Sequence, residues 1–328
     1  MNSIKRAEYA ENLKQHAISA TSIALLTHKN PDGDGLAAAL ALKKIFSAFG
    51  IKSDIILENE CPQRYDFING SENTLVFNKS MKYEMAILLD CHERSRLGSC
   101  SQILENTSEI YTIDHHQERI LIEHAHNWLN SNATSAGEII WNMFEKEIRK
   151  IDSEEDKKYI ASALYTTILN DTDNFANNNT NGKTFRMCAG LTEIGLNPGD
   201  IQKKFICGKT VSEMKLIAKV LSTIDQPSKE IIYIDSTLEM LNSLGLTQES
   251  TAKMAKLLKG TKGVEVIVYF REAAENTYRL SLRSDSVDVN RIAGNYGGGG
   301  HTRAAGCEIR GNLLEVKSMI FENIKEQL

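Results

Sequence analysis

The chain has 328 residues, of which 41% are hydrophobic and 25% charged, as in an ordinary soluble globular protein of about two domains. Its formal net charge of −5 argues against a protein that coats long nucleic acid by electrostatics alone, but is compatible with short nucleic acids. No apolar stretch is long enough to cross a bilayer, and the N-terminus lacks the apolar segment of a signal peptide, so we expect a cytoplasmic protein. Six cysteines without a CxxC pair favour reduced thiols over disulfides or a zinc–thiolate site.

The first half of the chain alternates short apolar runs with helical patterns. The apolar runs predict buried parallel strands at residues 23–27, 54–57, 84–90 and 109–114. Helices are predicted at residues 35–50, 135–150 and 155–169. This alternation is typical of an open α/β sheet, in which ligands bind beyond the carboxyl ends of the strands.

The second half contains a helical stretch and then a smaller α/β set. The helical pattern covers residues 183–225 and is interrupted at 197–200 by the segment NPGD. Further on, strands are predicted at 230–235, 264–270 and 277–284, with a helix at 248–260. We therefore expect a first domain at residues 1–190, a helical connector at 191–225 and a second domain at 226–328, with boundaries accurate to about ten residues.

An acidic loop, THKNPDGDGL (27–36), follows the first predicted strand. The loop is not an EF-hand, because its twelfth position is Ala41 instead of glutamate and the preceding segment has a strand pattern. A plain polar turn is the simplest interpretation of this loop when it is considered alone.

Polar side chains also follow three other apolar elements. Strand 84–90 ends in Asp90, strand 109–114 ends in Asp114 and continues into His115 and His116, and helix 155–169 is followed by Asn170 and Asp171. Because the ends of parallel strands meet at one edge of a sheet, we expect these groups to form one site. Carboxylates and imidazoles without thiolates favour Mn²⁺ or Mg²⁺, and two such ions about 3.5–4 Å apart suit in-line attack on phosphorus.

Five segments in this order carry a resemblance to a known family: HKNPDGDG (28–35), LLDCHERSRLG (88–98), IDHH (113–116), LNDTDNF (169–175) and GGGGHTRAAG (297–306). The chain resembles the DHH–DHHA1 phosphoesterases, and most of all the branch that degrades very short RNA and dephosphorylates 3′-phosphoadenosine 5′-phosphate (pAp). The resemblance implies an open, mostly parallel α/β DHH domain that binds metal and a smaller α/β DHHA1 domain that binds substrate. It also implies a helical connector between them and an active site in the cleft between the two domains.

The resemblance implies two divalent metal ions, with Mn²⁺ preferred and Mg²⁺ as the alternative. One ion would be bound by His28, Asp32 and Asp90. The other would be bound by Asp34, Asp90, His115 and Asp171, so that Asp90 bridges the two ions.

The resemblance also assigns catalytic roles. Asp114 would orient the histidines from behind, and His116 would face the scissile phosphate as a donor or proton-transfer group. A water molecule activated by the ions would be the nucleophile, without a serine or cysteine nucleophile. One departure from the family is Asp173, where the motif usually has glycine. We interpret this extra carboxylate as solvated, with a tuning of metal or substrate preference as the alternative.

The glycine run at 297–300 precedes a strand-like segment, so it is not a typical linker. Consecutive glycines permit close backbone approach and can form an anion-binding nest. In the resembling family this segment and the strand SLRS (281–284) receive the terminal phosphate and base of the substrate. The expected substrate contacts are Arg283, Gly299, Gly300, His301, Arg303 and Asn290. As an alternative to substrate contact by Asn290, the segment DVN (288–290) caps the helix that follows it.

The resemblance implies a hydrolase that degrades oligoribonucleotides and linear dinucleotides to mononucleotides and removes phosphate from pAp. The direction of attack, 3′–5′ or 5′–3′, stays open. The alternatives are a cyclic-dinucleotide phosphodiesterase and a catalytically silent nucleotide sensor, although every expected metal ligand is intact. We expect no long nucleic acid and no membrane as partners, and leave a homodimer open.

The remaining histidines and tryptophans receive simpler interpretations. His92, His124 and His126 are interpreted as surface or capping residues, with His92 near enough in sequence to Asp90 to approach the site. Trp128 and Trp141 are interpreted as packing residues instead of platforms for base stacking.

Overall fold

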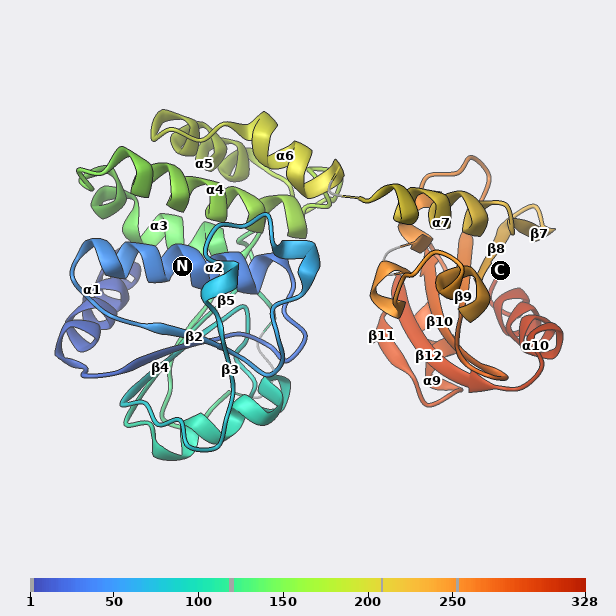
Figure 1. The fold of residues 1–328 in the computed structure, drawn as a ribbon, viewed down its shortest axis with the longest axis horizontal. Helices are drawn as coiled ribbons and strands as arrows, with labels where there is room; N and C mark the ends of the chain where they lie inside the picture. Colours follow the sequence, from blue (N-terminus) through green and yellow to red (C-terminus); the bar gives the residue numbers. More distant parts are fainter. Residues whose placement is uncertain (1–2, 118–120, 208, 252–253) are drawn as a thin grey trace. The chain divides into compact units, whose positions relative to one another are not determined.

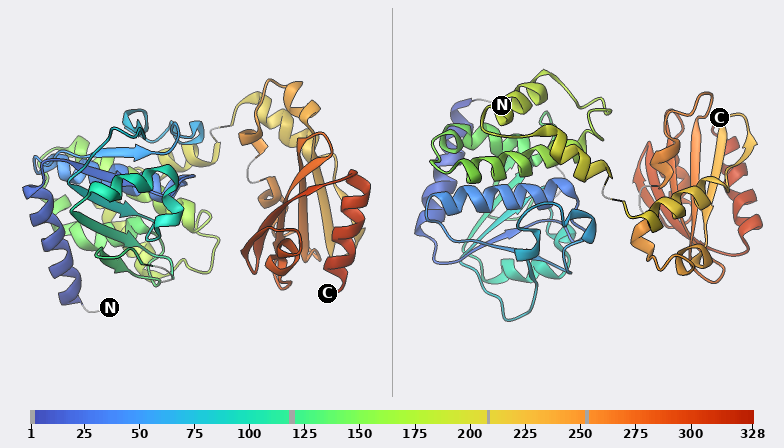
Figure 2. Two further views of the ribbon diagram at one scale, coloured as in Figure 1. Left: turned by 90° about the horizontal axis from the view of Figure 1, so that it is seen from below. Right: turned by 45° about the horizontal axis from the view of Figure 1, so that its top comes forward.

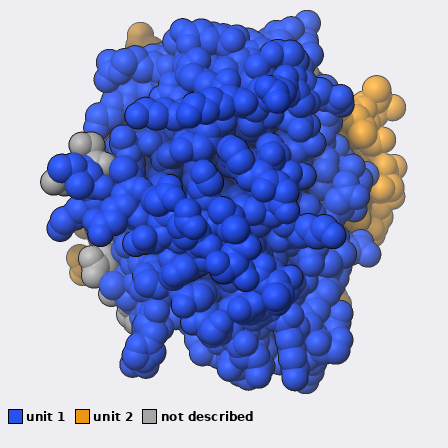
Figure 3. Space-filling view, turned by 90° about the vertical axis from the view of Figure 1, so that its left-hand side faces the viewer, with its two compact units in different colours: residues 1–208 blue, residues 209–328 orange. Residues whose placement is uncertain are grey.

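The computed structural model describes residues 3–117, 121–207, 209–251 and 254–328. The chain forms two compact units, residues 1–208 and residues 209–328 (Figures 1 and 3). Each unit has its own sheet and its own apolar core. The expected α/β class with a larger and a smaller sheet-containing part is confirmed.

The first unit is built on a parallel sheet with strand order β3-β2-β1-β4-β5-β6. Its strands are β1 (Ile23–Leu26), β2 (Asp54–Leu57), β3 (Leu75–Val76), β4 (Met85–Leu89), β5 (Glu109–Asp114) and β6 (His126–Leu129). The four predicted strands are confirmed, and the sequence analysis missed the short edge strands β3 and β6. All strands run in the same direction, so the residues that follow β1, β4 and β5 meet at one edge.

Six α-helices accompany this sheet in the described part of the first unit: α1 (Ser3–Ser19), α2 (Gly33–Ala48), α3 (Ala136–Arg149), α4 (Glu154–Asp171), α5 (Gly182–Glu193) and α6 (Pro198–Cys207). Helices α1, α2, α3 and α4 share a core with one sheet face (Figures 1 and 2). The opposite face packs on the 3₁₀ segment η3 (Arg94–Asn106). Both faces are covered, which explains why these strands are apolar throughout instead of alternating.

The second unit has a mixed sheet with strand order β11-β12-β10-β9-β8-β7. The strands are β7 (Asp225–Ser228), β8 (Ile231–Ser236), β9 (Val266–Ala274), β10 (Thr277–Ser284), β11 (Gly299–His301) and β12 (Ala304–Arg310). Within the described strands of this second sheet, β8 and β9 pair in parallel and the other neighbours pair antiparallel. Helices α9 (Val289–Gly294) and α10 (Leu313–Lys325) cover one face, and α7 (Val211–Leu221) and α8 (Leu238–Asn242) cover the other.

The helix predicted at residues 248–260 is wrong. Two short 3₁₀ segments, η4 (Gln248–Thr251) and η5 (Met254–Leu258), replace it, and residues 252–253 lie outside the described residues. The side-chain amide of Gln248 donates to the carbonyl of Glu272 at 2.7 Å, which anchors the segment to the end of β9. Tertiary contacts of this kind override a moderate helix propensity.

The predicted packing role of the tryptophans is confirmed, because Trp128 and Trp141 are both buried in the core of the first unit. Within the described residues, none of the helices combines the length and apolar character needed to cross a membrane.

Candidate metal centre

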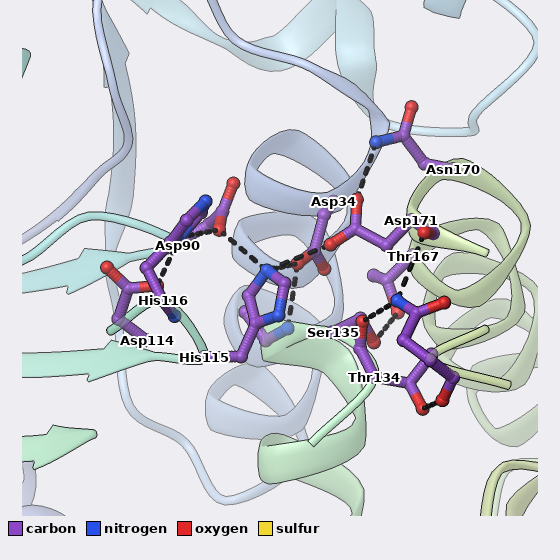
Figure 4. Close-up of polar contacts among 12 residues, drawn as sticks. Asp34, Asp90, Asp114, His115, His116, Thr134, Ser135, Thr167, Asn170 and Asp171 are labelled. Carbon is purple, nitrogen blue, oxygen red and sulfur yellow. Dashed lines mark hydrogen bonds and ion pairs between the residues drawn. The ribbon is translucent and has the colours of Figure 1, made fainter. Parts of the chain in front are cut away.

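The predicted metal ligands meet at the edge of the first sheet where β1, β4 and β5 end. Figure 4 shows four of them, Asp34, Asp90, His115 and Asp171. His28 and Asp32 lie in the loop after β1, Asp34 in the first turn of α2, Asp90 directly after β4, His115 directly after β5, and Asp171 in the last turn of α4. The strand register brings the three strand ends to one level, since Leu26 pairs with Leu88 and Leu89 with Ile113.

The first ligand set contains Asp34, His115 and Asp171. Nε2 of His115 lies 2.8 Å from Oδ2 of Asp171 and 3.6 Å from Oδ2 of Asp34. The candidate donor atoms of the three residues lie within 4.8 Å of one another. Ligands about 2.0–2.2 Å from one ion lie about 2.9–4.4 Å apart, so this spacing fits a divalent cation.

The second ligand set contains His28, Asp32 and Asp90. Nε2 of His28 lies 3.6 Å from Oδ2 of Asp90 and 3.9 Å from Oδ1 of Asp32. These donor atoms also lie within 4.8 Å of one another. Oδ1 of Asp32 already accepts hydrogen bonds from the amides of Asp34 and Gly35, which fixes the carboxylate at the start of α2.

Asp90 lies between the two sets and presents one carboxylate oxygen to each. Its Oδ2 faces His28, whereas its Oδ1 lies 3.4 Å from Nε2 of His115. The residue is 2% exposed, and its Oδ1 has no well-formed hydrogen bond within the described ranges. Without metal, the imidazoles of His115 and His116, at 3.4 Å and 3.3 Å, offset the charge of this buried oxygen, and a bound cation can take over that role. The side chain therefore fits a bridging position between two ions.

The backbone at Asp90 is also unusual, with a φ of +56°. Non-glycine residues reach the left-handed region at a cost, and such strain is found at functional sites where the surroundings hold it in place. The amide of Asp90 donates to the carbonyl of Ile113 at 3.0 Å, which extends the pairing of β4 with β5 by one residue. This turn directs the carboxylate across the sheet edge toward both ligand sets.

Asp34 is completely buried, and two main-chain amides at the start of α3 hold its carboxylate. The amide of Ala136 donates to Oδ2 at 2.7 Å, and the amide of Gly137 to Oδ1 at 3.3 Å. Burial raises the pKa of Asp34 well above its ordinary value, and the carboxylates of Asp171 and Asp90 raise it further. Without cations, so many buried carboxylates repel one another, so the donor set fits divalent metal.

The imidazoles have the opposite pKa behaviour. Burial opposes protonation of His115, but contacts with Asp171 and Asp90 outweigh it and raise the pKa of His115 to about 12. In the same way, Asp32 and Asp90 outweigh burial and raise the pKa of His28 to about 9. In the protein without metal, protons therefore occupy the nitrogens that an ion needs.

Asp114 supports a pair of histidines, one of which the sequence analysis misinterpreted. Its Oδ1 lies 2.8 Å from Nδ1 of His116, and its Oδ2 lies 2.6 Å from Nδ1 of His92. His92 is 1% exposed, so its interpretation as a surface or capping residue is wrong. The left-handed turn at Asp90 carries the chain back under the site, and this turn has no signature in the sequence.

A further charged group at the site is His116, whose pKa is raised to about 9 by Asp114 and Asp90.

Two domain assignments decide the family. Residues 22–168 match the N-terminal domain of the DHH family, and residues 232–327 match the DHHA1 domain. The chain belongs to the DHH–DHHA1 family.

Similar proteins carry names that state an activity. The chain is 24% identical over 307 residues to the "Bifunctional oligoribonuclease and PAP phosphatase NrnA" of Mycoplasma genitalium, covering 93% of both proteins. It is 26% identical over 309 residues to the protein of the same name from Thermus thermophilus, covering 93% of this chain and 90% of the relative. A solved structure with the same fold is an exopolyphosphatase-related protein from Bacteroides fragilis, with a TM-score of 0.85, 22% identity, and coverage of 97% of this chain and 96% of the other.

The structure explains why the family motif after Asp171 usually has glycine where this DHH domain has Asp173. Three successive residues, Asp173, Asn174 and Phe175, have φ values of +49°, +59° and +67°. The turn is held by the amide of Phe175, which donates to Oγ1 of Thr172 at 2.8 Å, and by Gln202, which donates to the side chain of Asn174 at 2.8 Å. A left-handed φ favours glycine at the first of these positions.

Replacement of Asp173 by glycine should therefore raise the free energy of unfolding by about 0.5–1 kcal/mol and leave phosphoesterase turnover within about twofold. Denaturant unfolding and an activity assay measure the two effects. Asp173→Ala is the matched control, because it removes the carboxylate but keeps the strain, and it should lower stability. Loss of turnover in both variants would instead give the Asp173 carboxylate a role in the metal centre.

In the DHHA1 domain, the glycine run forms a hairpin instead of a linker. Strand β11 pairs antiparallel with β12, with Gly299 opposite Gly306 and His301 opposite Ala304. Gly298 needs to be glycine, because a Cβ there would overlap the carbonyl of Gly306. The tip of this hairpin, including His301, is exposed.

The other expected substrate contacts lie on β10 and around α9. Arg283 is half-buried, and its guanidinium donates to the carbonyl of Leu282 at 2.7 Å. Its burial lowers its pKa, and no carboxylate forms an ion pair with it in the described part of the chain. Arg303 donates to the carbonyl of Val287 at 3.2 Å. The capping role of the segment DVN is confirmed, because the side chain of Asp288 accepts from the first amides of α9.

Proposed function

We propose that the protein is a metal-dependent phosphohydrolase that degrades short oligoribonucleotides to mononucleotides and dephosphorylates pAp. The observation that carries this proposal is the pair of ligand sets that share the buried, strained Asp90. The names of the relatives from Mycoplasma genitalium and Thermus thermophilus support the substrate class.

In this proposal, His28, Asp32 and Asp90 hold one ion, and Asp34, Asp90, His115 and Asp171 hold the other. Oxygen-rich ligands with imidazole suit Mn²⁺, and we propose it as the metal. When bound, the ions neutralise the phosphate and make a water molecule nucleophilic near neutral pH.

His116 is proposed to donate a hydrogen bond or proton to the reacting phosphate. Asp114 fixes the orientation of its ring, because Nδ1 of His116 faces Oδ1 of Asp114 and leaves Nε2 available. His92 holds the other oxygen of Asp114 and so limits rotation of that carboxylate. In the protein without metal, Asp114 and Asp90 raise the pKa of His116 to about 9, and the contact with Asp114 favours the protonated, donating form of the ring.

For the substrate's terminal phosphate, we propose Arg283 and His301 with the amides of Gly299 and Gly300, and place Arg303 and Asn290 nearby. A half-buried guanidinium without a carboxylate partner is costly unless an anion binds it. A terminal phosphate is an anion of the required charge.

A panel of substrates with Mn²⁺ tests this proposal: RNAs of increasing length, pAp, and linear and cyclic dinucleotides. Turnover should be fastest for pAp and RNAs of two to about five nucleotides and fall steeply with length, because an acidic protein repels a long phosphate backbone. Salt should have little effect, since few counterions are released. A preference for the cyclic dinucleotide would favour the phosphodiesterase alternative, and binding without turnover would favour a nucleotide sensor.

Replacement of Arg283 by alanine should weaken binding of substrates with a terminal phosphate by roughly 1.5–3 kcal/mol, the value of a charge-assisted contact. The comparison is KM for the same dinucleotide with and without that phosphate. Arg279→Ala is the matched control, because Arg279 lies on the same strand and is exposed, and its Nε pairs with Glu308 at 2.9 Å. Equal losses on both dinucleotides would contradict the assignment.

A further inference from the structure

A second group of metal-ligand side chains lies at the other edge of the first sheet. His16 is in the last turn of α1, Glu109 is the first residue of β5, and His126 is the first residue of β6. One donor atom from each lies within 4.8 Å of the other two. The three residues are far apart in the sequence, so no local sequence motif indicates this group.

The distances match those of ligands around one ion. Oε2 of Glu109 lies 3.2 Å from Nδ1 of His16 and 3.3 Å from Nε2 of His126. Ligands about 2.0–2.1 Å from a tetrahedral ion lie about 3.3–3.4 Å apart. A single carboxylate oxygen thus faces two imidazole nitrogens at the separation that a shared ion requires. Two imidazoles and one carboxylate are ligands typical of zinc and its neighbours.

Aromatic packing holds the two histidines in place before any ion binds. The ring of His126 stacks on Tyr111, its partner in the β5–β6 register, with centroids 4.6 Å apart. The hydroxyl of Tyr111 lies 2.8 Å from Nδ1 of His16. This is the nitrogen that faces Glu109, so the hydroxyl itself is near enough to complete the coordination. Packing that fixes the orientation of the rings favours metal binding.

Helix α1, which carries His16, is itself fixed to this part of the sheet. The hydroxyl of Tyr9 donates to the carbonyls of Thr112 at 2.8 Å and His126 at 3.2 Å. The ring of Tyr9 also packs edge-on against Tyr111, with centroids 5.5 Å apart. His16 is therefore part of a docked helix, and its distance to β5 and β6 is a feature of the fold.

This group is distinct from the catalytic centre. Glu109 begins β5 and Asp114 ends it, so the two sites are separated by the length of a six-residue strand, about 16 Å. The side chains of His16, Glu109 and His126 are 42%, 39% and 49% exposed, so an ion can enter directly from solvent.

We propose that His16, Glu109 and His126 bind a zinc-class divalent ion that fastens α1 to the amino ends of β5 and β6. The ion links three segments whose association is part of the native fold, so its binding stabilises the folded protein. It takes no part in phosphate chemistry, and the catalytic ions do not depend on it.

The test measures zinc bound by the full chain after loading with Mn²⁺ and dialysis against buffered Zn²⁺. Wild type is compared with His16→Ala, His126→Ala and the size-conserving Glu109→Gln. Each variant should hold one zinc equivalent fewer per chain than wild type, and Zn²⁺ should no longer raise its Tm as much. Zinc that replaces manganese at the catalytic centre cancels out when the zinc content of a variant is subtracted from that of wild type. Mn²⁺-dependent turnover of the variants should stay unchanged.

The matched control is His124→Asn, two residues from His126, exposed, and with a φ of +59° that asparagine tolerates. It should keep the full zinc content. Co²⁺ provides an independent readout, because the wild-type spectrum should contain a tetrahedral component that is absent in Glu109→Gln. Equal zinc content in wild type and all three variants, or an unchanged Co²⁺ spectrum, would overturn the proposal.

Discussion

Replacement of Asp90 by asparagine should reduce turnover by at least about 1,000-fold, since both ions lose a ligand in one step. Removal of a group that only supports a metal ligand costs about 10–100-fold, so a bridging ligand should exceed that range. Asparagine has the size of aspartate and tolerates the φ of +56° at this position, so the fold should be preserved. Asp90→Ala should abolish turnover as well, but it also adds backbone strain.

The measurements for Asp90 are turnover with Mn²⁺, metal content per chain and the thermal unfolding midpoint. Asp54→Asn is the matched control, because Asp54 lies at the amino end of β2 in the same sheet and accepts a hydrogen bond from Tyr83 at 3.0 Å. The control should keep its metal and its rate. An Asp90→Asn protein with normal metal content and a near-normal rate would contradict the two-metal scheme.

The position of the metal centre was predictable because it follows from strand direction. Asp90 and Asp114 end apolar runs, and parallel pairing necessarily brings such ends to one edge. Patterns of period and polarity carry this information directly in the sequence. Asp171 ends a helix instead of a strand, and it reaches this edge because α4 packs on α2 and ends beside the loop that follows β1.

His92 and His16 were not predictable in the same way. His92 reaches Asp114 only because Asp90 has a left-handed backbone that turns the chain, and the sequence does not encode that turn as glycine. His16 meets Glu109 only after α1 has docked through Tyr9, a contact between residues about a hundred positions apart. Contacts that depend on tertiary docking leave no periodic signal.

The helix predicted at 248–260 failed for a related reason. Its apolar residues Met254, Ala255 and Leu258 are buried, as in an amphipathic helix. The segment that carries them, however, is a short 3₁₀ helix instead of an α-helix. The anchor of Gln248 on β9 determines the path of the chain there, and local propensity is too weak to oppose it.

Metal binding at the catalytic centre should become tighter as the pH rises and should release about two protons near neutral pH. The reason is that His28 and His115 have pKa values raised to about 9 and about 12 in the protein without metal, so both carry protons that the ions displace. Each ion displaces one of these protons, so the affinity for each ion should rise about tenfold per pH unit below pH 9, and the product of the two affinities about 100-fold.

The sign follows from competition: acid returns protons to the imidazoles and weakens binding, and base removes that competition. Titration of Mn²⁺ against a chromophoric chelator between pH 6.5 and 8.5 gives the slope, and calorimetry in buffers of different ionisation enthalpy counts the protons. His28→Gln should lower the slope by about one proton per chain, because one protonated ligand is gone. His116→Gln is the matched control, since His116 has a similar raised pKa but lies outside both ligand sets, and it should keep most of the slope. An affinity independent of pH, or equal losses of slope in the two variants, would show that these imidazoles do not bind the ions.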